Sequence, residues 1–174
     1  MAGTCQGVNS FIDGGQTVSQ TVFLTKSLTI RGGYTRNNWS TSNPDTNITT
    51  LDALNLGRTV YITGSAQVEI IGLHLIQGAA DNGGAILVGS GALTMTHSQV
   101  YSSHATLGGG ALYSQAGTTV SLIGDNQANG DNQIFGNTAA WGGAFYNDGA
   151  QFTLDDNTIA ENQANQGDLR TECR

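Results

Sequence analysis

The sequence of 174 residues is poor in proline, cysteine and charged residues. A single proline, Pro44, and the lack of a glycine at every third position exclude collagen. Charged residues make up 11%, against about 25% in typical soluble domains, whereas a disordered chain combines high charge with low hydrophobicity. No apolar run approaches the roughly 18 residues of a membrane-spanning helix. These absences indicate a chain that folds around a core and does not insert into a membrane.

Positive charge is almost confined to the first third of the chain. Lys26, Arg31, Arg36 and Arg58 are followed by no other lysine or arginine until Arg170. Nine acidic residues occupy that interval, and the net charge is -7. Nucleic acids and anionic membrane surfaces are bound through lysine and arginine. The sequence therefore disfavours both as partners.

Glycine, threonine and asparagine are abundant, with 25, 21 and 15 residues. All three are poor helix formers, and the strongest charged helix formers are scarce. Threonine favours strands, and glycine and asparagine favour turns. With 38% hydrophobic residues available for a core, the composition predicts an all-β fold.

Three short motifs recur at intervals of 25 to 34 residues, which indicates a repeat protein. The first is a Gly-Gly-Ala-apolar tetrad, found at Gly83-Gly84, Gly109-Gly110 and Gly142-Gly143. The second is a turn motif at residues 75–78, 100–103, 134–137 and 159–162, which ends in Asn137 and Asn162 in its last two copies. The third is an apolar alternation at Val68/Ile70, Leu93/Met95, Val120/Leu122 and Phe152/Leu154.

The repeats predict a right-handed single-stranded parallel β-helix with three strands per rung and about 25 residues per rung. Alternate side chains of a strand point to one side, and a single rung cannot bury its apolar side alone. The glycine pairs are expected at the corners, and the amides of Asn137 and Asn162 are expected to stack in a turn. The predicted core residues are Val68, Ile70, Ile86, Leu93, Met95, Leu112, Val120, Leu122, Phe145, Phe152 and Leu154.

The whole chain, 1–174, is interpreted as one β-helix domain. We expect an N-terminal cap at 1–15, an excursion loop at 32–56, regular rungs at 57–165 and a C-terminal tail at 166–174. Alternating apolar residues predict further strands at 17–25, 27–31, 48–51 and 58–63.

The tetrads and turn motifs resemble the GGA[IL] and FxxN repeats of chlamydial polymorphic outer membrane proteins. They are also similar to repeats of bacterial right-handed β-helix surface and secreted proteins. The best matching stretches are 142–147 (GGAFYN) and 132–139 (NQIFGNTA), and the resemblance covers about residues 20–165. It implies export to the cell surface or exterior. One departure is the missing fourth tetrad, where Gln-Gly-Asp-Leu stands at 166–169.

Candidate catalytic and metal-binding residues are few. Asp155-Asp156 is similar to the paired aspartates of β-helix hydrolases, but neighbours on a strand face opposite ways, so the pair reads better as a turn. A lyase would need a basic residue, and no lysine or arginine occurs between Arg58 and Arg170. His97 and His104 lack evident further ligands. We expect no catalytic residue, no cofactor and no metal.

Tyr113 and Tyr146 follow two of the tetrads at equivalent outward positions. Such rings either stack on sugars, as in a glycan-binding module, or simply stack on each other between rungs. The sequence leaves both interpretations open.

The ends of a β-helix expose unpaired strand edges and a slice of core, which invites another copy to add. Cys5 and Cys173 would lie near opposite ends, too far apart for an internal disulfide but suited to a head-to-tail intermolecular one. We therefore expect a non-enzymatic extracellular structural protein that assembles end to end into filaments. The alternatives are a monomeric adhesin that binds surface glycans and, third, a carbohydrate-active enzyme of the pectate lyase kind.

Overall fold

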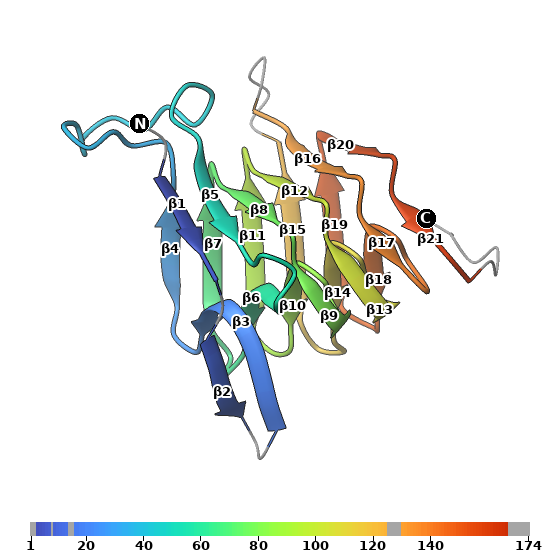
Figure 1. Cartoon of the computed structure of the whole chain (residues 1–174). Helices are drawn as coiled ribbons and strands as arrows, with labels where there is room; N and C mark the ends of the chain where they lie inside the picture. The colour runs from blue at the N-terminus through green and yellow to red at the C-terminus, as the bar shows by residue number, and fades with distance from the viewer. Residues whose placement is uncertain (1–2, 8, 14–15, 125–129, 167–174) are drawn as a thin grey trace.

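The computed structural model describes residues 3–7, 9–13, 16–124 and 130–166. The fold is all-β, and its strands form four sheets (Figure 1). Every strand pair is parallel among the described residues, apart from the antiparallel pair β2–β3 and an isolated antiparallel bridge in a loop. Within these ranges no helix is long and apolar enough to cross a membrane. The parallel sheets are compatible with a β-solenoid.

The four sheets are named A to D, and their strands are given in spatial order. Sheet A contains β1 (Gly3–Gln6), β5 (Thr49–Asp52), β8 (His74–Ile76), β12 (Gln99–Tyr101), β16 (Asn132–Phe135) and β20 (Asn157–Ala160). Sheet B contains β2 (Asn9–Asp13), β3 (Gln16–Leu24), β6 (Arg58–Ile62), β10 (Ile86–Val88), β14 (Leu112–Ser114) and β18 (Phe145–Asn147). Sheet C contains β4 (Leu28–Arg31), β7 (Gln67–Ile71), β11 (Ala92–Thr96), β15 (Thr119–Ile123) and β19 (Gln151–Asp155). Sheet D contains β9 (Ala79–Asn82), β13 (His104–Gly108), β17 (Thr138–Ala139) and β21 (Gln163–Ala164).

From β6 onward the chain visits sheets B, C, A and D in turn and then returns to sheet B. One such circuit is called a repeat, and the last runs from β18 to β21. The strands predicted at 17–25, 27–31, 48–51 and 58–63 are confirmed as β3, β4, β5 and β6. Each repeat holds a fourth strand, in sheet D, that the expected three strands per rung did not include.

The core consists of columns of apolar side chains that run across the repeats. In sheet C, for example, Ile70, Met95 and Leu122 occupy one register column and are at most 1% exposed. Eight of the eleven predicted core residues are buried, which confirms the predicted register. These residues are Val68, Ile70, Ile86, Leu93, Met95, Leu112, Val120 and Leu122.

The other three predicted core residues lie in the last repeat and differ. Leu154 is 41% exposed, so its assignment to the buried core is wrong, and Phe145 and Phe152 are only partly buried. Their strands, β18 and β19, are the outermost of their sheets. No described strand lies beyond them to cover their side chains.

The predicted segments outside the regular repeats are partly described. In the expected cap at 1–15, β1 joins sheet A and β2 forms an antiparallel hairpin with β3. The expected excursion at 32–56 has no strand until β5. Within it Asn38 accepts hydrogen bonds from the backbone amides of Ser40 and Thr41. Of the expected tail at 166–174, residues 167–174 lie outside the described part.

Candidate functional site

The predicted glycine pairs lie at the turn that enters sheet B. They are Gly83-Gly84, Gly109-Gly110 and Gly142-Gly143. The first glycine of each pair has a φ between 61° and 69°, a conformation that favours glycine. The second glycines pack against backbone, because a Cβ on Gly110 would collide with the carbonyl oxygens of Gly143 and Thr138. The pairs therefore allow successive repeats to approach closely.

Gly110→Ala is expected to lower the free energy of unfolding by about 1–3 kcal/mol, because overpacked backbone must shift. Gly136→Ala is the matched control, since a Cβ at this position meets nothing within 4 Å. Its only cost is the strain of placing alanine at a φ of 61°. Urea denaturation of both variants measures the difference. A smaller loss for Gly110→Ala than for Gly136→Ala would contradict the steric argument.

The predicted stacking of Asn137 and Asn162 is present as a hydrogen-bonded ladder. The Nδ2 of Asn137 donates to the Oδ1 of Asn162 over 2.9 Å. The same oxygen accepts from the backbone amide of Asn137 over 3.1 Å. One repeat earlier, the Oδ1 of Asn137 accepts from the backbone amide of Ser103 over 3.0 Å. Each side chain thus satisfies a buried amide of its neighbouring repeat.

A second ladder, which sequence reasoning missed, runs five residues earlier in each repeat. The Nδ2 of Asn132 donates to the Oδ1 of Asn157 over 2.9 Å, and Asn132 accepts from the backbone amide of Ser98. The signal was the spacing, because asparagine recurs five residues apart in both of the last two repeats. Ser98 and Ser103 occupy the equivalent positions one repeat earlier and use their hydroxyls.

Tyr113 and Tyr146 lie opposite each other in β14 and β18 of sheet B. Their ring centroids are 5.2 Å apart and the planes differ by 1°, so each ring gives one face to the other. The hydroxyl of Tyr113 donates a hydrogen bond to Asp148. Partial burial of Tyr113, together with this hydrogen bond, raises the pKa of the Tyr113 hydroxyl. Stacking between repeats is therefore present, and Tyr146 keeps 37% of its surface exposed.

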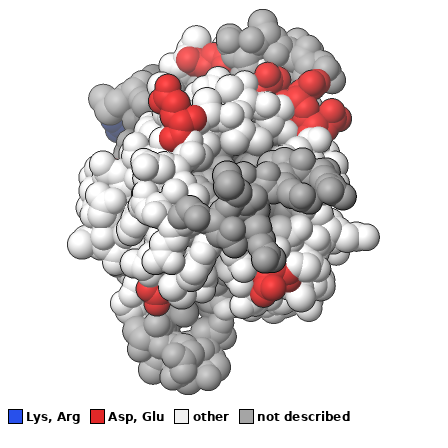
Figure 2. Space-filling model, turned by 90° about the vertical axis from the view of Figure 1, so that its right-hand side faces the viewer, with Lys and Arg blue, Asp and Glu red and all other residues white. Residues whose placement is uncertain are grey.

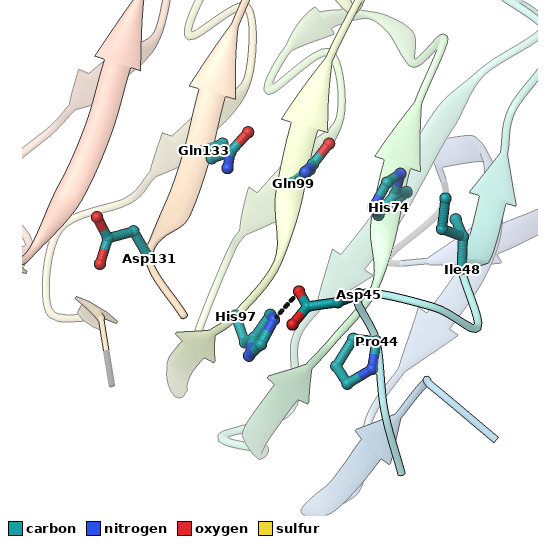
Figure 3. A pocket seen from close by; sticks show the side chains of 8 residues that line it. All are labelled: Pro44, Asp45, Ile48, His74, His97, Gln99, Asp131 and Gln133. Atoms are coloured by element: carbon teal, nitrogen blue, oxygen red, sulfur yellow. Dashed lines mark hydrogen bonds and ion pairs between the residues drawn. The ribbon is translucent and has the colours of Figure 1, made fainter. Parts of the chain in front are cut away.

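A hollow of about 230 Å³ lies where the excursion loop meets sheet A (Figure 3). Its floor includes His74, Gln99 and Gln133, which are successive partners in the register of sheet A. Pro44 and Asp45 of the excursion loop form its wall. Partial burial lowers the pKa of His74, which favours the neutral imidazole.

The excursion loop is held to the hollow by an interaction that the sequence did not predict. The Nε2 of His97 lies 2.9 Å from the Oδ1 of Asp45, 52 residues earlier (Figure 3). Pro44 packs against Gly72, where an added Cβ would collide with the proline ring. Local sequence carries no signal for this contact, because the loop reaches it from a distant part of the chain.

The candidate catalytic residues do not gather into a site. The turn expected at Asp155-Asp156 is confined to Asp156, which has a φ of 48°, because Asp155 is the last residue of β19 and β20 begins at Asn157. His104 contacts the hydroxyl of Thr138 rather than His97. In the ranges that the structure describes, no three histidine, cysteine or acidic side chains lie together as metal ligands would.

The two ends of the sheets differ in charge, and each end has exposed apolar side chains. At the C-terminal end Leu154 and Ile159 are each 41% exposed. Asp155, Asp156 and Glu161 are exposed on the same repeat. In Figure 2, which looks at this end, the described acidic side chains lie near the margin of the face.

At the N-terminal end β4 is the first strand of sheet C, and its Leu28 is 39% exposed. Lys26 and Arg31, beside it in sequence, are exposed. The exposed charges on and next to β4 are therefore basic, and those on and next to β19 are acidic.

Cys5 lies in β1, in register with Leu51, at the first edge of sheet A. The side chain of Cys5 and the whole of Cys173 fall outside the part that the structure describes. An intermolecular disulfide between them therefore stays a prediction.

Comparisons with models of protein families, with curated proteins and with solved structures find no match. The class that the structure defines is an all-β protein of stacked parallel strands.

Proposed function

We propose that the chain is a non-enzymatic structural protein outside the cell, whose copies join end to end into filaments. In this proposal the chain is a right-handed β-helix with three main sheets, A to C, and a short fourth strand at one corner. Parallel strands joined by a crossover are almost always connected in the right-handed sense, which supports this handedness. The placement outside the cell rests on the resemblance of the GGA and FxxN motifs.

The observation that carries the proposal is that both end strands of sheet C have exposed apolar side chains and an edge without a described partner. The apolar columns of sheet C end in partly exposed side chains at β4 and at β19. Each of these strands also has one edge without a described partner. Exposed edges of this kind pair with another chain unless something covers them. An interface between the two different ends does not close on itself, so it propagates as a fibre.

Ile159→Asp tests the proposal, because it places a charge in the apolar surface of the C-terminal end. Ile159 is already 41% exposed, so we expect the variant to fold and to lose assembly. Thr158→Asp is the matched control, because Thr158 is its exposed neighbour on the same strand and points to the opposite face. Negative-stain electron microscopy and sedimentation velocity measure the result over a range of protein concentrations.

Filaments of the unmodified chain and of Thr158→Asp, but not of Ile159→Asp, would support the proposal. Loss of the filaments in reductant would also support the predicted disulfide between Cys5 and Cys173 of neighbouring copies. Monomers of the unmodified chain at every concentration would overturn it. The second candidate, a monomeric glycan-binding adhesin, would then take precedence, since Tyr146 presents exposed aromatic surface beside Asp148. A glycan array would test that candidate.

A further inference from the structure

The floor of the hollow beside sheet A is a row of polar side chains. His74, Gln99 and Gln133 are successive register partners on β8, β12 and β16, and Figure 3 shows them on neighbouring strands. The next residue along each strand is buried in the core, so these three side chains lie on the outer face of the sheet. Adjacent strands are about 4.8 Å apart, which is close enough for one small ligand to contact all three.

Most polar groups of this hollow have no partner within the chain. Gln99 and Gln133 are opposite each other in the register, yet neither side-chain amide has a hydrogen bond to a described residue. The carboxylate of Asp131, which also lines the hollow, has no such partner among the described residues either. In the two asparagine ladders of the same repeats, by contrast, the amides bond to one another. The donors and acceptors of the hollow are therefore available to a ligand.

The chemistry of the lining favours a neutral ligand with several hydroxyl groups. A glutamine amide donates and accepts, and so does the neutral imidazole of His74, which partial burial favours by lowering its pKa. A hydroxyl group also donates and accepts, so it can pair with each of them. Pro44 and Ile48 of the excursion loop add apolar surface that suits C–H groups.

Charged ligands and metal ions fit the hollow less well. No lysine or arginine is among the described residues that line it, and these side chains are the strongest partners of phosphates and carboxylates. Nor do its histidine and acidic side chains, within the described ranges, gather as three metal ligands. The volume of about 230 Å³ is below the roughly 300–1,000 Å³ of sites for drug-sized ligands, which leaves room for a single small ring.

We propose that the hollow binds one neutral pyranose residue of a sugar. Its hydroxyl groups bond to Gln99, Gln133 and Asp131, and its C–H face lies against Ile48. The site is on the outer face of sheet A, whereas the stacked tyrosines belong to sheet B. It does not depend on the proposed end-to-end assembly, because it uses neither end of the sheets.

Nuclear magnetic resonance of the histidine rings tests the site. The chain has three histidines, of which His74 and His97 line the hollow, while His104 lies in sheet D and is the internal control. The probes are the methyl glycosides of glucose, galactose, mannose and N-acetylglucosamine. We expect at least one probe to shift the ring signals of His74 and His97 and to leave those of His104 in place. Three or four hydrogen bonds correspond to a Kd on the order of 1 mM.

Two variants place the binding at the floor of the hollow. Gln133→Ala should weaken binding by about fivefold, and Gln99→Ala/Gln133→Ala should abolish it. Both glutamines are partly exposed, so we expect both variants to fold, which circular dichroism verifies. Thr158→Ala is the matched control, because Thr158 is the next register partner of Gln133 but does not line the hollow. The unassembled chain is measured, with Ile159→Asp as the background if filaments form.

Shifts at His74 and His97 that disappear in the double variant and persist in Thr158→Ala would support the site. Binding that the double variant leaves unchanged would overturn it, as would equal shifts at all three histidines. Stronger binding of methyl glucuronide or of putrescine than of every neutral glycoside would overturn the choice of a neutral sugar. Failure of all four neutral glycosides to bind at concentrations well above the expected Kd would overturn the proposal. None of these outcomes bears on filament formation, which electron microscopy tests separately.

Discussion

Replacing Leu122 with aspartate is expected to leave the chain unfolded. Leu122 is fully buried in sheet C, between Met95 and Leu154 of the neighbouring strands. A buried carboxylate without a partner costs several kcal/mol or forces its own protonation. That cost is of the order of the whole stability of a small domain, about 5–15 kcal/mol. No lysine or arginine occurs between Arg58 and Arg170 to pair with the new charge. Far-ultraviolet circular dichroism and thermal melting measure the effect.

Ser121→Asp is the control for this variant. Ser121 precedes Leu122 in β15 and is partly exposed, because neighbouring residues of a strand face opposite sides. We expect this variant to melt within a few degrees of the unmodified chain. A soluble Leu122→Asp variant with the melting temperature of the unmodified chain would contradict the register of sheet C.

Asn137→Ala is expected to have the second largest effect, a loss of about 3 kcal/mol of unfolding free energy. The fully buried side chain accepts from the amide of Ser103 and donates to the carbonyl of Val100, over 3.0 Å each. It also donates to Asn162. Alanine would leave the buried amide of Ser103 without its acceptor. Chemical denaturation followed by circular dichroism measures the loss.

Two further variants separate the ladder from the mere loss of an asparagine. Asn137→Ser should fall between alanine and asparagine, because a hydroxyl already serves as the acceptor at the equivalent Ser103. Asn165→Ala removes an exposed side chain and should leave stability unchanged within about 0.5 kcal/mol. Equal stability of Asn137→Ala and Asn165→Ala would show that the ladder contributes nothing to the fold.

Much of the fold was predictable because its signals are periodic. In Val68/Ile70 and Leu93/Met95, the alternation determines which side chains share a face, and the interval of 25 residues determines which strands pair. The glycine pairs were equally readable, because a left-handed φ and a close backbone approach both select glycine. Asn137 and Asn162 were recognised since they occupy the same position in two repeats.

The strands of sheet D were not predictable from the same signals. β17 and β21 contain two residues each, too few for an apolar alternation, and the longer β9 (Ala-Ala-Asp-Asn) and β13 (His-Ala-Thr-Leu-Gly) do not repeat one apolar pattern. The second asparagine ladder was missed although its spacing was visible. The hollow beside sheet A had no local signal at all, because Asp45 and His97 are 52 residues apart.

By itself the sequence determined the direction and register of the central strands, since repeated alternation admits one pairing that buries every apolar face. Only the tertiary structure decided how the two ends differ. Leu154 and Leu122 carry the same side chain in the same column, yet one is 41% exposed and the other is fully buried. The difference lies in the strands on either side of them, because burial depends on neighbours as much as on the residue itself.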